Sequence, residues 1–272
     1  METKIRQPVV AGQFYPSGEA DIRKQIRGFL SKKTPAIEAI ACIVPHAGYI
    51  FSGKVAARTF SRVNIKKKII LIGPNHTGSG AKFSIMTEGE WATPLRKTRI
   101  DSSLSKSILA RSKYLEDDSL AHMREHSLEV ELPLIQYLKE DFEIVPIVVF
   151  PEESRILKEI GKAIADSVMD AGLKDSCLIV ASSDMTHYEP FSQAKKKDSA
   201  AIEAINQLDE DKLARRVLGL DISMCGYAPV AIMLSAAKEL GATQAELVDY
   251  QTSGEVSGDF DNVVGYAGMI IY

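Results

Sequence analysis

The sequence contains little cysteine. Its three cysteines, Cys42, Cys177 and Cys225, are too few and too widely spaced among 272 residues to build a disulfide framework. They form no CxxC pair, which excludes a zinc knuckle with that spacing. We therefore expect a reducing compartment and predict a cytoplasmic location.

The chain also lacks a strong net charge and long apolar runs. Its 33 basic and 36 acidic residues give a formal charge of −3, too weak a field to gather nucleic-acid phosphates or an anionic membrane. No run approaches the roughly 18 apolar residues that cross a bilayer, and the polar start METKIRQP lacks the apolar core of a signal peptide. We expect neither nucleic acid nor membrane as a partner.

Nucleotide-binding fingerprints are missing as well. The glycines of GPNHTGSG match neither the phosphate loop ending in GKS or GKT nor the dinucleotide pattern GxGxxG. We therefore predict no nucleotide cofactor.

No internal repeat, low-complexity tract or Pro/Ser-rich linker divides the chain. Hydrophobic residues make up 45% and charged residues 25% of the composition, which is ordinary for a globular protein. Since α/β folds of this length often have one core, we predict a single domain over residues 1–272.

Apolar runs rich in isoleucine and valine alternate with helical patterns. The predicted strands are Ala39–Val44, Lys68–Ile72, Ile144–Phe150, Cys177–Ala181, Ala245–Tyr250 and Val263–Ile271. The predicted helices lie near Ile22–Leu30, Gly53–Phe60, Ser102–Ala110, Leu128–Leu138, Ile156–Val168, Ser192–Leu208 and Tyr227–Leu240. This alternation predicts an α/β fold with a mostly parallel central sheet flanked by helices on both faces. The last two strands could pair antiparallel instead, and Phe83–Arg99 interrupts the alternation as an inserted hairpin or rim loop.

Three predicted strands are each followed by a turn signal and a histidine. The sequences IACIVPHAGYIFSG, KKIILIGPNHTGSG and CLIVASSDMTHYEP place His46, His76 and His187 just past separate strands. In open α/β sheets the loops at this edge converge over the ligand-binding crevice. Any one of them could be a hydrogen-bonded structural histidine, but the threefold coincidence predicts a shared pocket.

Cys225 lies immediately before a strongly apolar predicted helix that carries Pro229 early, where proline suits a first turn. A thiol at a helix N-terminus faces unpaired N–H groups, which favour the thiolate, the form that binds metals. Cys42 and Cys177 lie within apolar strands and are assigned to the core.

Imidazole and thiolate together suit iron, copper or zinc and do not suit magnesium or calcium. Two of the histidines and Cys225 would complete one face of a mononuclear site. Asp184 and His187 would then supply a hydrogen-bond acceptor beside the ligands and a general acid or base. Asp184 could equally be a turn or helix cap.

The segment HMREH, His122 to His126, matches the H-x-x-E-H zinc-peptidase pattern, with Glu125 as the base. A five-residue pattern is weak, and the preceding EDDSLAHM is typical of a loop. Ser127 is the more natural start of a helix, as a cap for Leu128–Leu138. That start would leave His122 in a loop and exclude the peptidase interpretation.

Longer motifs give the chain a specific resemblance. PVVAGQFYP, VPHAGYIFSG, GPNHTG, EHSLEVELP, SSDMTHY and MCGYAPV occur in the order and spacing of the Memo family and span essentially the whole chain. The sequence resembles Memo proteins, including the Memo component of the AmmeMemoRadiSam system.

The resemblance implies a fold similar to class III extradiol, non-haem iron dioxygenases. It implies His46, His76 and Cys225 as metal ligands, and Asp184, His187, His126 and Glu129 as further pocket residues. In those dioxygenases a carboxylate takes the place of the cysteine, so the resemblance does not imply ring cleavage.

Three functions follow as hypotheses. The first is redox chemistry on an unidentified small substrate, with iron or copper as cofactor and zinc as a third metal. The second is a non-catalytic module that binds phosphotyrosine or anionic peptides in the same pocket, and the third is metal-assisted hydrolysis with Asp184 or Glu129 as base. The family association also implies AMMECR-type and radical SAM proteins as partners, and exposed edge strands would allow a homodimer.

Overall fold

A nine-stranded mixed sheet is the centre of the computed structural model, which describes residues 4–30 and 35–272. The strand order is β10-β12-β2-β9-β3-β8-β4-β7, and β11 also pairs with β12. The bounds are β2 Ala41–Val44, β3 Lys68–Pro74, β4 Phe83–Ile85, β7 Glu116–Asp117, β8 Glu143–Val149, β9 Cys177–Ser182, β10 His187–Glu189, β11 Ala245–Thr252 and β12 Val263–Ile271. The four central strands β2, β9, β3 and β8 are parallel, whereas β12 and β4 join them antiparallel.

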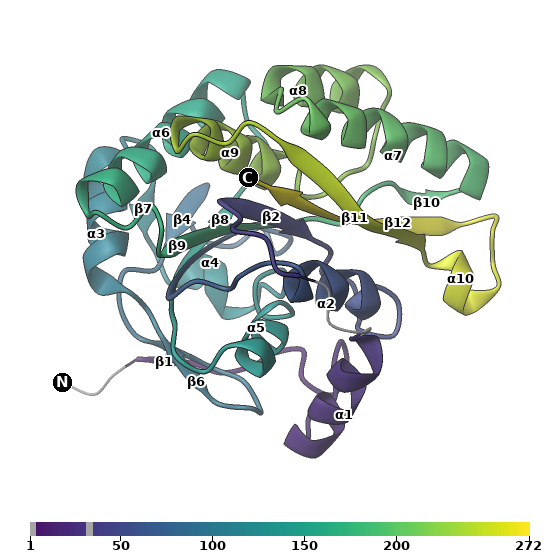
Figure 1. Cartoon of the computed structure of the whole chain (residues 1–272), viewed down its shortest axis with the longest axis horizontal. Coiled ribbons are helices and arrows are strands. Elements are labelled where there is room, and N and C mark those ends of the chain that lie inside the picture. Colours follow the sequence, from purple (N-terminus) through teal and green to yellow (C-terminus); the bar gives the residue numbers. More distant parts are fainter. Residues whose placement is uncertain (1–3, 31–34) are drawn as a thin grey trace.

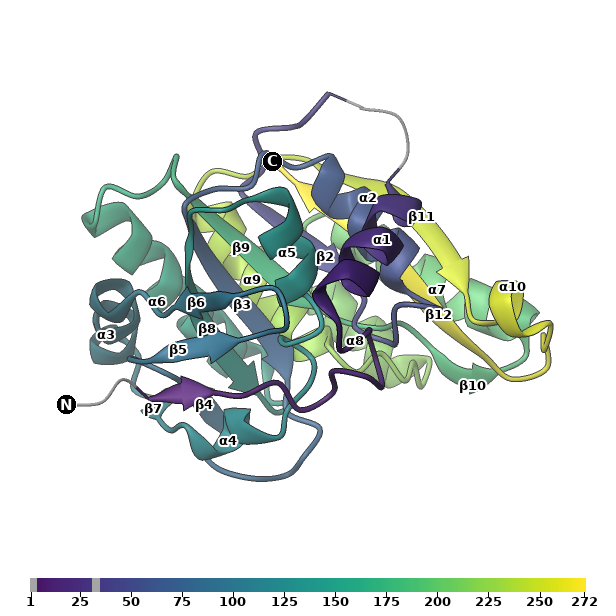
Figure 2. The ribbon, with the colours of Figure 1, turned by 90° about the horizontal axis from the view of Figure 1, so that it is seen from below.

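Helices cover both faces of this sheet (Figure 1). One face carries α6 Ser154–Asp170, α7 Phe191–Asn206, α8 Glu210–Gly219 and α9 Tyr227–Glu239. The other carries α1 Glu19–Phe29, α2 Gly53–Ser61 and α5 Leu132–Leu138, which lie over the strands in Figure 2. The remaining helices are α3 Ser102–Arg111, α4 Leu120–Met123 and α10 Gly254–Ser257. The predicted α/β class with helices on both faces is therefore confirmed.

Alternation along the central strands separates two apolar cores. In β3, Ile70 and Ile72 belong to the core beneath α6 and α9, whereas Ile69 and Leu71 belong to the core beneath α1, α2 and α5. All four side chains are fully buried. A strand that is buried on both faces has a continuous apolar sequence, and for this reason the central strands could be predicted from the sequence.

The region predicted as an inserted hairpin contributes to two sheets. β4 joins the edge of the large sheet, while β5 Glu90–Ala92 and β6 Lys97–Arg99 form an antiparallel hairpin. The hairpin pairs with β1 Ile5–Arg6 in a separate three-stranded sheet. The last two strands, β11 and β12, pair antiparallel, which is the alternative that the sequence left open.

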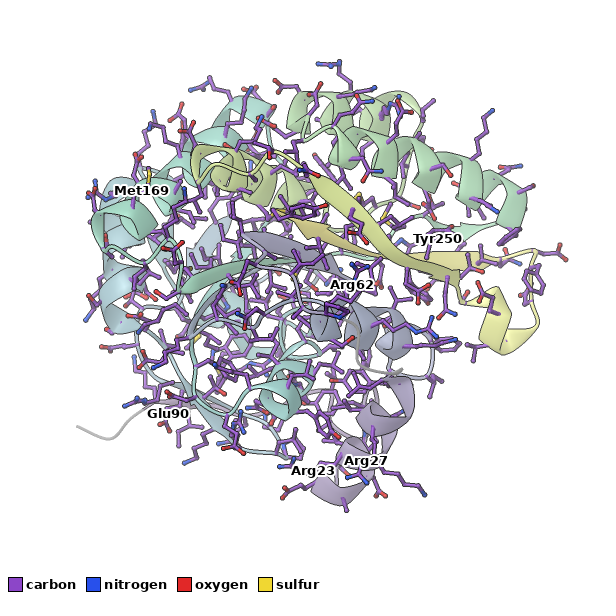
Figure 3. The ribbon with its side chains drawn as sticks, viewed as in Figure 1. Arg23, Arg27, Arg62, Glu90, Met169 and Tyr250 are labelled. Carbon is purple, nitrogen blue, oxygen red and sulfur yellow. The ribbon has the colours of Figure 1, made fainter. Side chains whose placement is uncertain are left out.

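Salt bridges at the surface attach α2 to the outer strand β11. Arg58 binds Asp249 at 2.7 Å and Arg62 binds Glu246 at 2.5 Å. Figure 3 shows Arg62 near β11 and Arg23 on α1. No helix among the described residues combines the length and apolarity that crossing a membrane requires.

One predicted helix begins later than expected. The segment expected to be helical from Leu128 forms turns first, and α5 begins at Leu132 with Pro133 in its first turn. Proline in a helix interior would lack an N–H for the carbonyl of Glu129 and its ring would collide with that oxygen. Pro133 therefore fits only a helix that begins beside it.

Candidate metal centre

A pocket of about 540 Å³ opens where the parallel strands β2, β3 and β9 end. His46 and His76 follow β2 and β3, and His187 begins β10 shortly after β9. All three line the pocket, so the predicted convergence of these histidines is confirmed. His126 and Asp184 line it as well.

Three histidines meet at the floor of the pocket. Potential ligand atoms of His46, His76 and His126 all lie within 4.8 Å of one another. Burial, with smaller effects from His76, His126 and His187, holds the pKa of His46 well below its usual value. His46 is therefore a neutral imidazole, the form of histidine that binds metals.

The Nδ1 atoms of His46 and His76, the two histidines that follow β2 and β3, both have a hydrogen-bond partner. His46 Nδ1 lies 2.8 Å from Ser182 Oγ, and His76 Nδ1 lies 2.9 Å from Glu125 Oε1. Burial opposes ionisation of Glu125, but hydrogen bonding and charge from His76 outweigh it and lower the pKa to about 2. The carboxylate of Glu125 therefore accepts a hydrogen bond from Nδ1–H of His76, and the Nε2 atom of His76 stays free to bind a metal, as in metal-binding histidines.

His126 reaches the group from the turn that precedes α5. Its ring stacks on His76 with centroids 4.7 Å apart and contacts Phe14 edge-on at 4.8 Å. Burial lowers its pKa, so this ring is also predominantly neutral near pH 7. The sequence placed His126 in the pocket, but its membership of the three-histidine group depends on how distant segments pack.

Cys225 lies beside the histidines, outside the group within 4.8 Å. Its Sγ is 3.4 Å from His46 Nε2 and 3.7 Å from the carbonyl oxygen of Asp184. In the metal-free pocket, the surroundings of Cys225 oppose the thiolate that a helix N-terminus was expected to favour. Burial and the charge of Asp184 raise the pKa of the Cys225 thiol well above its usual range, and α9 begins only at Tyr227.

Asp184 and His187 line the pocket together with the three histidines. Asp184 Oδ1 accepts the backbone N–H groups of His46 at 2.9 Å and Ala47 at 3.3 Å, so the carboxyl fixes the turn that carries His46. Burial raises the pKa of Asp184 to about 6. His187 Nδ1 lies 2.8 Å from the carbonyl oxygen of Ser223 and therefore donates to it, leaving Nε2 available.

Glu129 is not a pocket residue, contrary to expectation, because it points to the N-terminal segment. It forms a buried ion pair with Arg6 and accepts hydrogen bonds from the backbone of Val9 and Val10 and from the hydroxyl of Tyr15. The sequence could not show this, since its partners lie more than a hundred residues away. Glu129 thus anchors the segment that brings Phe14 to the pocket.

The H-x-x-E-H pattern does not form a zinc-peptidase site. His122 is fully buried in α4, and its Nε2 lies 3.0 Å from Ser84 Oγ. The expectation of a loop at His122 is wrong, because His122 lies in α4. The peptidase interpretation still fails, because His126 lies beyond the end of α4 and lines the pocket. Glu125 contacts His76 instead of serving as the base of a peptidase.

Comparisons with known proteins agree with this description. The family model of Memo-like proteins matches residues 6–270. MEMO1 family proteins of Aquifex aeolicus and Methanopyrus kandleri are 41% and 40% identical, over 98% and 97% of this chain and 99% and 98% of theirs. A crystal structure of an uncharacterised Escherichia coli K12 protein has a similar fold, with a TM-score of 0.54 and 13% identity over 85% of this chain and 98% of that one. The chain belongs to the Memo family.

Proposed function

We propose that this protein is a metal-dependent oxidoreductase that holds iron or copper between His46, His76 and Cys225 and acts on a small substrate. The observation that carries the proposal is that the Nδ1 atoms of His46 and His76 already have hydrogen-bond partners, while ligand atoms of these two rings and of His126 lie within 4.8 Å of one another. His126 is close enough to replace or supplement the thiol as a ligand. Zinc would satisfy the same donors.

Nitrogen and sulfur donors fit a borderline transition metal. A bound iron or copper ion would supply one-electron chemistry. The chain itself would position and protect the substrate, since Phe14, Phe51 and Tyr266 form an apolar wall beside the histidines. His187 would give or take a proton at Nε2, because its Nδ1 proton is held by Ser223.

The pocket favours this function over peptide binding and hydrolysis. No lysine or arginine occurs among the described residues that line it, whereas recognition of phosphate groups commonly uses arginine clusters. Glu129 is unsuited to act as the base of a hydrolase because it is ion-paired with Arg6 away from the pocket. Asp184 alone would remain for that role.

The test is the metal content of protein purified without a tag or added metal, followed by titration under reducing conditions. We expect bound iron or copper, binding at least tenfold weaker in His46→Ala and His76→Ala, and unchanged binding in the matched pocket variant His187→Ala. A sulfur-to-metal absorption band that Cys225→Ser removes would assign the thiol as ligand. No binding of iron, copper or zinc, or undiminished binding in both ligand variants, would contradict the proposal.

A further inference from the structure

A buried carboxyl lies behind His46, on the side away from the pocket. Glu131 directly precedes α5 and is fully buried. Its Oε1 lies 3.0 Å from the hydroxyl of Ser182, the last residue of β9, and the same hydroxyl lies 2.8 Å from His46 Nδ1. Glu131 therefore reaches His46 through one intervening oxygen.

The hydroxyl of Ser182 has three neighbours and only one proton to donate. The third neighbour is the backbone oxygen of Ser127, 2.8 Å away, which can only accept. All three contacts are hydrogen bonds only if Ser182 donates to Ser127 and accepts from both His46 Nδ1 and Glu131 Oε1. That assignment requires a proton on His46 Nδ1 and a proton on the carboxyl of Glu131.

The surroundings of the carboxyl support the same assignment. Within the described part of the chain, Glu131 Oε2 is buried and has no hydrogen-bond partner, and no salt bridge reaches Glu131. An ionised carboxylate with a single hydrogen bond would be strongly destabilised there. Burial raises the pKa of Glu131 well above its usual range, and the charge of Asp184 acts in the same direction.

We propose that Glu131 is a permanently neutral acid that donates to Ser182 and thereby holds His46 with its proton on Nδ1 and its Nε2 lone pair toward the pocket. Glu131 is a positioning residue, since it acts through Ser182. The inference deepens the proposed function and rests on it only where His46 is taken as a metal ligand.

This arrangement makes the two strand-end histidines unequal donors. His76 gives its Nδ1 proton to the ionised Glu125, and a carboxylate partner raises the basicity of the imidazole. His46 gives its proton to a hydroxyl that is supported by a neutral acid. The site therefore has one strong and one weaker imidazole donor and carries no additional buried charge behind His46.

Two spectroscopic measurements on metal-free protein test the inference directly. Infrared difference spectra of wild type minus Glu131→Gln at pH 7 should contain the carbonyl band of a protonated carboxylic acid. Nitrogen-15 spectra of labelled histidine should show His46 with Nδ1 protonated in wild type and in Glu131→Gln, whose amide still donates to Ser182. In Ser182→Ala the same spectra should show a mixture of the two tautomers.

A zinc titration extends the test to metal binding. We expect Glu131→Gln to bind within about threefold of wild type and Ser182→Ala to bind roughly 10- to 100-fold more weakly, the usual loss when a partner of a ligating histidine is removed. A carboxylate band, or a proton on Nε2 of wild-type His46, would overturn the inference even if Ser182→Ala fails to fold. Failure of His46→Ala to weaken metal binding would instead overturn the proposed function and leave the two spectroscopic results intact.

Discussion

Two glutamates near the candidate metal centre have pKa values shifted in opposite directions. Glu125 is buried but accepts from His76, from the backbone N–H of His76 and from that of Ser127, and these contacts favour the carboxylate. Glu131 is buried with one hydroxyl contact, which favours the acid. Both carboxyls are buried, so the number of hydrogen bonds that each one accepts decides which of them is favoured as the carboxylate.

The state of Glu125 makes stability depend on pH. Because folding lowers its pKa from 4.5 to about 2, the folded state favours the carboxylate, and this contribution is complete above about pH 4.5 and lost as pH falls toward 2. The shift corresponds to about 3 kcal/mol. We expect urea unfolding of wild type and Glu125→Gln to differ most near pH 7 and to converge as the pH is lowered to 3. A difference that does not change with pH would contradict this account.

Among the elements, the N-terminal segment from Arg6 to Val10 packs against the segment that leads into α5. Arg6 is fully buried, stacks 4.5 Å from the ring centroid of Trp91 and binds Glu129. It also donates to the backbone oxygens of His122 and Glu125, the segment that leads to His126. Arg6 therefore links the segment that carries His126 to the N-terminal segment.

We expect Arg6→Ala to lower the free energy of unfolding by about 3 to 5 kcal/mol, because Glu129 would remain buried without its cation. The matched control is Arg23→Ala, which removes the exposed pair of Arg23 with Glu19 on α1 and should cost less than about 1 kcal/mol. Urea unfolding at pH 7 measures both. Equal losses of unfolding free energy in the two variants would show that the buried contacts of Arg6 do not stabilise the fold.

Elements differed in how well the sequence predicted them. β12 was predicted with its observed bounds and α2 to within one residue, because each carries a complete apolar pattern and clear ends. The helix α8 was not predicted, although Asp209 caps it by accepting from the backbone N–H of Lys212. Its apolar face is short, since Leu213 and Val217 are its only buried apolar side chains, and no clear apolar period marks it in the sequence.

For the whole molecule, the parallel centre of the sheet explains which site residues could be predicted. His46 and His76 follow strands that end at one edge, so their convergence is a consequence of topology. The positions of His126 and Cys225 depend instead on how a turn and a helix start pack against that edge. Sequence patterns contain no such distances, and Glu129 was misplaced for the same reason.

The most direct measurement of the central claim is a crystal structure with anomalous data collected at the iron, copper and zinc edges from protein that was never exposed to added metal. The account predicts one iron or copper ion about 2.0 to 2.3 Å from the Nε2 atoms of His46 and His76, with Cys225 or His126 as a further ligand. An empty pocket, or a metal bound away from both histidines, would contradict it.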